Sequence, residues 1–270
     1  MVDLEMQKNL KPAKRDRINP ADRPAEDRIK DFAEVNLGFT DEEAVVEAER
    51  CVNCKDPKCV KGCPVGIDIP KFIMEVKSGD VEKAYKTIQE SHAFPCVTGR
   101  VCPQETQCES LCIYNKAAKP INIGKLERYV GDKMRGKSQA TKHNFIGSVG
   151  IVGSGPAAMA LAADLIRADI KPVIYEAFDK LGGVLVYGIP EFRLPEKIVN
   201  EEIENLIASG MEVHRGTIVG KTISFDELLA IHDYVFIGSG AGLPRLMGIP
   251  GEEANHVLTA NEFLTRVNLL

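Results

Sequence analysis

The residues best suited to chemistry are the eight cysteines, which all lie between Cys51 and Cys112. They form two groups that each contain a Cys-Pro pair, with one cysteine between the groups: Cys51-x2-Cys54-x4-Cys59-x3-Cys63-Pro64, Cys96, and Cys102-Pro103-x4-Cys108-x3-Cys112. Short loops of this kind bring neighbouring thiolates onto adjacent irons, and in bacterial ferredoxins the cysteine before proline ligates the other cluster. The spacing therefore predicts two [4Fe-4S] clusters in one small domain.

The same logic assigns seven of the cysteines to ligand sets. The first cluster is predicted to take Cys51, Cys54, Cys59 and Cys112. The second is predicted to take Cys63, Cys102 and Cys108. This second set lacks one ligand, which either Cys96 or an oxygen ligand supplies.

Three other uses of the cysteines compete with clusters. A disulfide framework needs an oxidising compartment, which nothing in the sequence indicates. A zinc site can use the pair Cys51 and Cys54, but zinc pairs usually repeat as two short knuckles. Inert buried thiols usually occur singly rather than clustered. The spacing favours clusters over all three.

A carboxylate on a helix is the candidate oxygen ligand. Ile123, Leu126 and Val130 form an apolar stripe, and Glu127 lies on the same helical face. A buried carboxylate is costly unless it is paired. It is therefore either a metal ligand, one half of a salt bridge with an Arg or Lys, or a solvated edge residue.

Composition sets the broad class. A chain of 270 residues is long enough for two domains. Its formal net charge of −5 does not indicate binding to nucleic acid or to an anionic membrane. No stretch approaches the roughly 20 apolar residues of a membrane span, and the N-terminus lacks the apolar core of a signal peptide. We therefore expect a cytoplasmic protein. The five histidines are scattered, so each is expected to be a surface or packing residue.

Three segments are expected along the chain. Residues 1–30 carry many charges and several prolines, and we expect an extended arm that lies on another surface or is disordered. Residues 31–145 are expected to be a helical [4Fe-4S]-binding domain, because helix caps and helical apolar spacing recur there without a strand pattern. Residues 136–144 are linker-like in composition, and residues 146–270 alternate strands with helices.

A nucleotide fingerprint opens the last segment. A short strand leads into Gly153-x-Gly155-x-x-Ala158, in which glycines permit a tight turn and close approach of a pyrophosphate to a helix N-terminus. Glu176 follows 21 residues after Gly155, at the end of the next strand, where an acid bonds ribose hydroxyls and disfavours a 2′-phosphate. The sequence predicts a dinucleotide site here, with a tight turn at Gly182 and Gly183 close by.

Longer motifs resemble those of a known family. Residues 94–103, 120–124, 153–157 and 182–195 are similar to the small (beta) subunit of NADPH-dependent glutamate synthase, and the resemblance extends over about residues 25–270. The same module occurs in the N-terminal half of dihydropyrimidine dehydrogenase and in the large subunit of NADH-dependent ferredoxin:NADP oxidoreductase.

The resemblance implies a multidomain fold, α followed by α/β. It implies an N-terminal helical two-cluster iron–sulfur domain and then a Rossmann-like, glutathione-reductase-like FAD-binding domain. It also implies that Glu127 completes the second cluster and that Cys96 is a bystander. The implied FAD contacts are Gly153, Gly155, Pro156, Ala157, Glu176, Gly182, Gly183, Gly240 and Ala241. Relatives continue into an NADPH domain, so the FAD domain is expected to be incomplete, the NADPH site to lie outside this segment, and Leu270 to be a cut through a larger protein.

The expected function is electron transfer between NAD(P)H, FAD and two [4Fe-4S] clusters to a partner, as in the glutamate synthase small subunit. The partner would be a glutamate synthase large subunit or another redox protein. The alternatives are a non-catalytic electron-wire module and a subunit of a ferredoxin:NADP oxidoreductase complex. A pyrimidine-reducing enzyme is disfavoured, because the FMN barrel that it needs is absent from the sequence.

Overall fold

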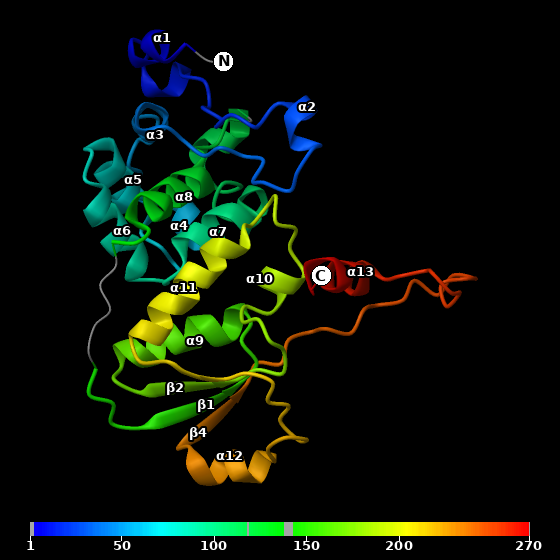
Figure 1. Cartoon of the computed structure of the whole chain (residues 1–270). Coiled ribbons are helices and arrows are strands. Elements are labelled where there is room, and N and C mark those ends of the chain that lie inside the picture. The colour runs from blue at the N-terminus through cyan, green and yellow to red at the C-terminus, as the bar shows by residue number, and fades with distance from the viewer. Residues whose placement is uncertain (1–2, 118, 138–142, 270) are drawn as a thin grey trace. The chain divides into compact units, whose positions relative to one another are not determined.

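The computed structural model describes residues 3–117, 119–137 and 143–269. The chain divides into two compact units, Met1–Ser138 and Gln139–Leu270 (Figure 1). Most of the expected linker over residues 136–144 lies outside the described residues.

The first unit is helical. Its elements are α1 (Leu4–Lys8), η1 (Pro12–Lys14), α2 (Ala25–Arg28), α3 (Asp41–Ala48), α4 (Lys58–Gly62), α5 (Ile69–Lys77), α6 (Val81–Gln89), α7 (Pro95–Val101), η2 (Gln104–Thr106), η3 (Ile113–Ala117) and α8 (Ile123–Met134). In its described residues the unit contains no strand beyond an isolated antiparallel bridge between Asp22 and Asn36. The predicted helical character of this region therefore agrees with the structure.

Local sequence explains where the main helices start. The Thr40 side chain accepts a hydrogen bond from the Glu43 N–H, and the Glu43 carboxylate accepts one from the Thr40 N–H. These two bonds form the predicted capping box of α3. Asp68 and Asp80 cap α5 and α6 without a capping box, each through a carboxylate that accepts a backbone N–H. The helices then bury their apolar faces around α8, whose Leu126 is fully buried. The two carboxylate caps fix where α5 and α6 begin, and these two helices pack against each other and against α8.

The N-terminal segment differs from the expected extended or disordered arm. It contains short helices, and its Ile18 is buried in the core of the first unit. The Ile18 N–H donates to Glu47 of α3 at 2.8 Å, and Arg17 pairs with Glu109 at 2.8 Å. The charges in this segment therefore form specific ion pairs and hydrogen bonds, which the prolines do not prevent.

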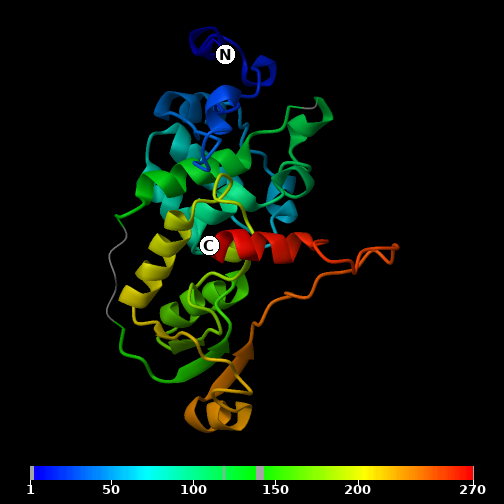
Figure 2. The same cartoon turned by 45° about the vertical axis from the view of Figure 1, so that its right-hand side comes forward.

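The second unit is an α/β unit with a parallel sheet. Its elements are β1 (Ser148–Val152), α9 (Pro156–Arg167), β2 (Lys171–Tyr175), α10 (Val184–Tyr187), α11 (Glu196–Ala208), β3 (Glu212–His214), α12 (Phe225–Ile231), β4 (Tyr234–Ile237) and α13 (Ala260–Leu269). The strand order is β3-β2-β1-β4, and all neighbouring strands are parallel. Figure 1 shows α9 and α11 on one face of the sheet, while Figure 2 shows α13 against α10.

This topology fixes where a ligand can bind. Parallel strands end at one edge of the sheet, and open α/β sheets bind ligands beyond the carboxyl ends of their strands. The turn after β1, the end of β2 and the turn after β4 all lie at that edge. None of the described helices is both long and apolar enough to cross a membrane.

Candidate functional site

The cysteines assigned to the first cluster line one cavity of about 670 Å³ in the first unit: Cys51, Cys54, Cys59 and Cys112. Cys51 follows α3, Cys59 lies within α4, and Cys112 immediately precedes η3. Between the first two cysteines, Asn53 has a φ of 50°, a left-handed conformation that Asn tolerates better than most residues. This turn lets Cys51 and Cys54 face the same cavity.

Burial raises the pKa values of two of these thiols, Cys51 and Cys59. It is the largest cause at Cys59, where the neighbouring Cys112 and Cys51 add to it and bring the pKa to about 12. Burial likewise raises the pKa of Cys51. Thiols of this kind stay protonated at neutral pH unless a bound metal displaces the proton. The site therefore suits a group that carries several positive metal ions.

The residues assigned to the second cluster form a separate group. Cys63 follows α4, Cys102 follows α7, Cys108 lies in the next loop, and Glu127 is on α8. Burial raises the pKa of Cys102 to about 11, with further contributions from Glu127 and Cys63. Burial also raises the pKa of Cys108, and Glu109, Glu127 and Cys63 act in the same direction. The structure thus brings these four residues together, while their role as iron ligands stays a prediction.

Glu127 is the buried carboxylate of this second group, with a side chain only 8% exposed. Its Oε1 lies 3.0 Å from His92 Nε2 and accepts a hydrogen bond from the Thr98 hydroxyl. The expected alternative was a salt bridge to an Arg or Lys, and the partners found are instead an imidazole and a hydroxyl. His92 thus does more than the expected surface or packing residue, because it holds the candidate ligand.

Close packing of α7 on α8 sets the position of Glu127. A Cβ on Gly99 would lie 2.5 Å from the Arg128 backbone nitrogen, and one on Gly131 would lie 2.7 Å from the Cys96 backbone nitrogen. Only glycine allows this approach, which carries Thr98 to the carboxylate. Cys96 itself is 2% exposed and lies against Gly131, one helical turn beyond Glu127. This contact accounts for its burial as helix packing.

Two buried acids hold the loops that carry the ligands. Glu47 is fully buried and accepts from the Asn122 N–H and from Arg50. Glu109, next to Cys108, accepts from the Gly124 N–H at 3.3 Å at the start of α8. Both acids therefore tie the ligand-bearing segments to the start of the helix that carries Glu127.

The donor set fits iron–sulfur clusters. Among the described residues, no group of three or more His, Cys, Asp or Glu side chains is arranged to hold a metal ion. A cluster makes a different demand, because each of its cysteines binds a separate iron. Four partly exposed thiols around a cavity, with the chain looping between them, meet that demand.

The second unit contains a cavity of about 1070 Å³ at the carboxyl ends of its strands. Of the predicted cofactor contacts, it is lined by Gly153, Gly155, Pro156, Ala157, Glu176, Gly183, Gly240 and Ala241. Gly153 has a φ of 93°, and a Cβ there would lie 2.6 Å from the Gly238 carbonyl oxygen. Gly155 is the N-cap of α9, and a Cβ there would meet no atom within 4 Å. The fingerprint thus leaves open space in front of a helix N-terminus.

Gly182 is the predicted cofactor contact that is not among the residues lining this cavity in the described chain. Its φ is 110°, and a Cβ on it would lie 2.8 Å from the Val186 side chain. Its N–H donates to the Ser154 hydroxyl at 3.1 Å. Gly182 therefore shapes the turn behind the cavity wall rather than facing the cavity.

Glu176 is held in place by the fingerprint turn itself. Its Oε2 accepts from the Ser154 N–H at 2.9 Å and from the Ser154 hydroxyl at 2.5 Å. Its Oε1 accepts from the Phe178 N–H at 2.8 Å and keeps capacity for a further donor. The acid is thus oriented at the cavity edge, where a ribose hydroxyl can donate to it.

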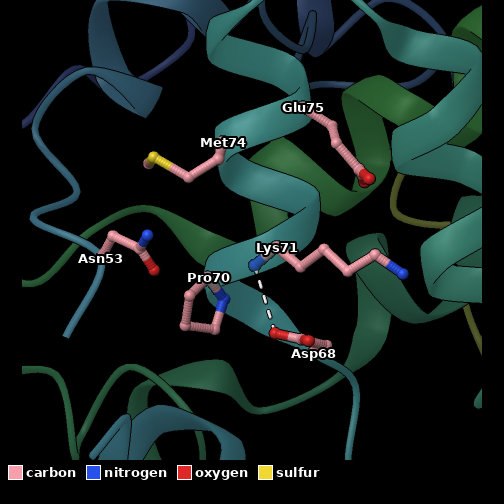
Figure 3. A pocket seen from close by; sticks show the side chains of 6 residues that line it. All are labelled: Asn53, Asp68, Pro70, Lys71, Met74 and Glu75. Carbon is pink, nitrogen blue, oxygen red and sulfur yellow. Dashed lines mark hydrogen bonds between the residues drawn. The ribbon is translucent and has the colours of Figure 1, made fainter. Parts of the chain in front are cut away.

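A smaller cavity of about 420 Å³ lies beside the loop between Cys51 and Cys54. Figure 3 shows Asn53 and Met74 at this cavity, and the dashed line marks the bond from the Lys71 N–H to Asp68, at 3.2 Å. That bond is the N-cap of α5. The polar groups of this cavity are therefore accounted for in part by helix capping, and it contains none of the predicted ligands.

Three residues with a part in these sites were missed from the sequence. His92 and Thr98 contact Glu127, although they lie 35 and 29 residues away along the chain. Ser154 occupies a variable position of the fingerprint and bonds the Glu176 carboxylate. Of the three, only Ser154 could have been found from the sequence, because a hydroxyl inside a glycine turn can donate a hydrogen bond to a nearby acid.

Comparison with known proteins places these features in context. The sequence profile of dihydropyrimidine dehydrogenase domain II, 4Fe-4S cluster, matches residues 28–139. The glutamate synthase [NADPH] small chain of Azospirillum brasilense is 34% identical over 92% of this chain and 53% of its own length. The oxidoreductase AegA of Escherichia coli, described as putative, is 35% identical over 88% of this chain and 37% of its own length.

Among solved structures, FprA from Mycobacterium tuberculosis in complex with NADPH is 25% identical, with a TM-score of 0.42 over 45% of this chain and 29% of that one. The chain spans about half the length of the glutamate synthase small chains that it matches. The resemblance expected from the motifs is confirmed: this chain is similar to glutamate synthase small chains over 92% of its length.

Proposed function

We propose that this chain is the iron–sulfur and FAD-binding part of an NAD(P)H-dependent electron-transfer subunit of the glutamate synthase type. Its first unit would hold two [4Fe-4S] clusters and its second unit would hold FAD. The NADPH site would lie outside this segment, and the partner would be a glutamate synthase large subunit or another redox protein. The similarity to glutamate synthase small chains over 92% of this chain supports the proposal.

One observation carries the proposal: the candidate ligands sort into two groups of four. Cys51, Cys54, Cys59 and Cys112 line one cavity. Cys63, Cys102 and Cys108 lie with Glu127 in the other group, as their mutual effects on pKa indicate. Hydrophobic packing does not by itself require that the candidate ligands form two groups of four, whereas two four-iron clusters do require it.

The chain's own residues would bind and orient these groups. The cysteines and Glu127 would ligate iron, while His92 and Thr98 would hold the Glu127 carboxylate in position. In the second unit, the N-terminus of α9 would face the pyrophosphate and Glu176 would accept from the ribose hydroxyls. When bound, FAD would convert two-electron reduction by a nicotinamide into the one-electron steps that clusters carry.

The two candidate clusters would differ in chemistry. A carboxylate oxygen in place of a thiolate changes the charge and hydrogen bonding around one cluster, and both set its reduction potential. The second group is the one with the carboxylate, and its Glu127 and Cys108 are buried. This asymmetry would give the two clusters unequal potentials and so a preferred order of electron transfer.

The test is the cofactor content of the anaerobically purified chain. The proposal expects about eight irons and about eight acid-labile sulfides per chain, as two [4Fe-4S] clusters require. It also expects about one FAD in the second unit, because the cavity lies beyond the strand ends, where open α/β sheets bind dinucleotides. Zinc in place of iron, or iron that stays at about four after reconstitution, would contradict the two-cluster proposal.

A further inference from the structure

The mouth of the cavity lined by the first cysteine group is apolar and exposed. Val52, Leu111 and Ile113 line this cavity and are 48%, 47% and 58% exposed. Large apolar side chains that gather at the rim of one site mark a surface that a partner covers. We refer to these three residues, with the lysines described next, as the cluster rim.

The same rim is positively charged. Lys58, Lys61 and Lys116 line the cavity together with a single acid, Asp56. Asp56 pairs with Lys58 at 2.5 Å and with Lys61 at 2.9 Å, and these lysines remain 58% and 62% exposed. Three cations against one anion leave a local excess of positive charge on a chain whose overall net charge is −5.

The second ligand group is less accessible from solvent. Cys108 and Glu127 are buried at 8% and 6% exposure, and Glu127 is enclosed by His92 and Thr98. All four cysteines of the first group are partly exposed. In the second group only Cys63 and Cys102 are partly exposed. Of the two candidate clusters, the first is therefore the more accessible to another protein.

We propose that the cluster rim is the docking surface for an electron-carrier protein whose own redox centre is surrounded by acidic residues. The inference rests on the proposed function, because it needs a cluster in the first cysteine group. Opposite charges steer such encounters and fix their orientation, while a small apolar centre excludes water. Redox encounters of this kind use small interfaces, which suits a rim of a few residues.

The experiment measures electron transfer from the reduced chain to two carrier proteins of opposite charge. The cluster-loaded chain is photoreduced and mixed by stopped flow with oxidised flavodoxin, which is acidic, or with cytochrome c, which is basic. The rate with flavodoxin should fall as salt rises. The double variant Lys61→Glu/Lys116→Glu should lower that rate about tenfold at low salt and raise the rate with cytochrome c.

A matched control changes the same amount of charge on α6. Lys83→Glu/Lys86→Glu alters two exposed lysines that do not line the cavity, and it should leave both rates within about twofold. Equal effects of the two double variants, or a flavodoxin rate that ignores both, would overturn the docking surface.

Two readouts separate this result from failure of the proposed function. Iron content and transfer to neutral benzoquinone report whether reducible clusters are present in each preparation. Clusters that reduce benzoquinone, together with unchanged carrier rates in Lys61→Glu/Lys116→Glu, would refute the docking surface alone. Loss of iron and of benzoquinone reduction in the unmodified chain would refute both proposals.

Discussion

Glu47 offers the sharpest test of how the cluster unit is held together. Its carboxylate is fully buried and accepts from the Ile18 N–H, from the Asn122 N–H and from Arg50, at 2.8, 2.8 and 2.6 Å. Arg50 is 1% exposed and also donates to the Lys119 carbonyl. The Glu47–Arg50 ion pair therefore connects the N-terminal segment, α3 and the loop before α8.

The change Glu47→Gln keeps the volume of the side chain and removes its charge. The Arg50 guanidinium is then left buried without a counter-ion, which costs about 3–5 kcal/mol. A loss of about 3 kcal/mol corresponds to roughly 100-fold faster exchange of the amides that open with this unit. Native-state hydrogen exchange, read by mass spectrometry on peptides from α3 and α8, measures this directly in the anaerobically purified chain.

Glu49→Gln is the matched control, one residue before Arg50. Glu49 pairs with Arg15, but its side chain is 31% exposed whereas that of Glu47 is fully buried, so water can replace part of this interaction and its loss should cost less than the loss of Glu47. Equal exchange rates in Glu47→Gln and Glu49→Gln would refute the claim that the buried pair stabilises this unit. Faster exchange confined to peptides from β1 and β2 would refute it as well.

Further changes test individual residues of the two sites. Glu127→Ala should reduce iron from about eight to about four per chain, whereas Cys96→Ser should leave it unchanged, and iron analysis of both would reveal the reverse assignment. Ser154→Ala removes a hydrogen bond to the Glu176 carboxylate and should weaken FAD binding about tenfold in a fluorescence titration, with unchanged affinity counting against that role. Burial lowers the pKa of His232 in the folded chain. As pH falls below about 6.5, His232 is therefore protonated in the unfolded chain before it is protonated in the folded chain. The folded chain loses stability over that pH range. Melting temperatures between pH 7 and pH 5 should therefore fall less steeply in His232→Gln, and parallel curves would contradict this.

Local spacing allowed much of the first unit to be predicted. Only a few residues separate Cys51, Cys54 and Cys59, so their sequence separation already limits how far apart they can be. Glu127 was identifiable as a candidate because a charged residue interrupts an apolar helical stripe, while the prediction that it is a ligand came from the family resemblance. The strand–turn–helix of the fingerprint was equally local, and its glycines have the positive φ or open space that such a turn requires.

Contacts between distant segments could not be predicted. His92 and Thr98 reach Glu127 only because Gly99 lets α7 pack closely on α8. The N-terminal segment was predicted to be extended because of its charges and prolines. These do not reveal that the Ile18 N–H donates to Glu47 or that Arg17 pairs with Glu109. In both cases the decisive partner is a buried carboxylate, whose need for a donor is visible only in three dimensions.

The central claim is that eight ligands divide into two independent sets of four, and single cysteine changes test it most directly. Cys54→Ala removes a ligand from the first cavity and Cys108→Ala removes one from the second group. The account predicts about four irons in each single variant, with different electron paramagnetic resonance spectra after reduction, and almost none in the double variant. Identical spectra in the two single variants, or loss of all iron in either one, would contradict it.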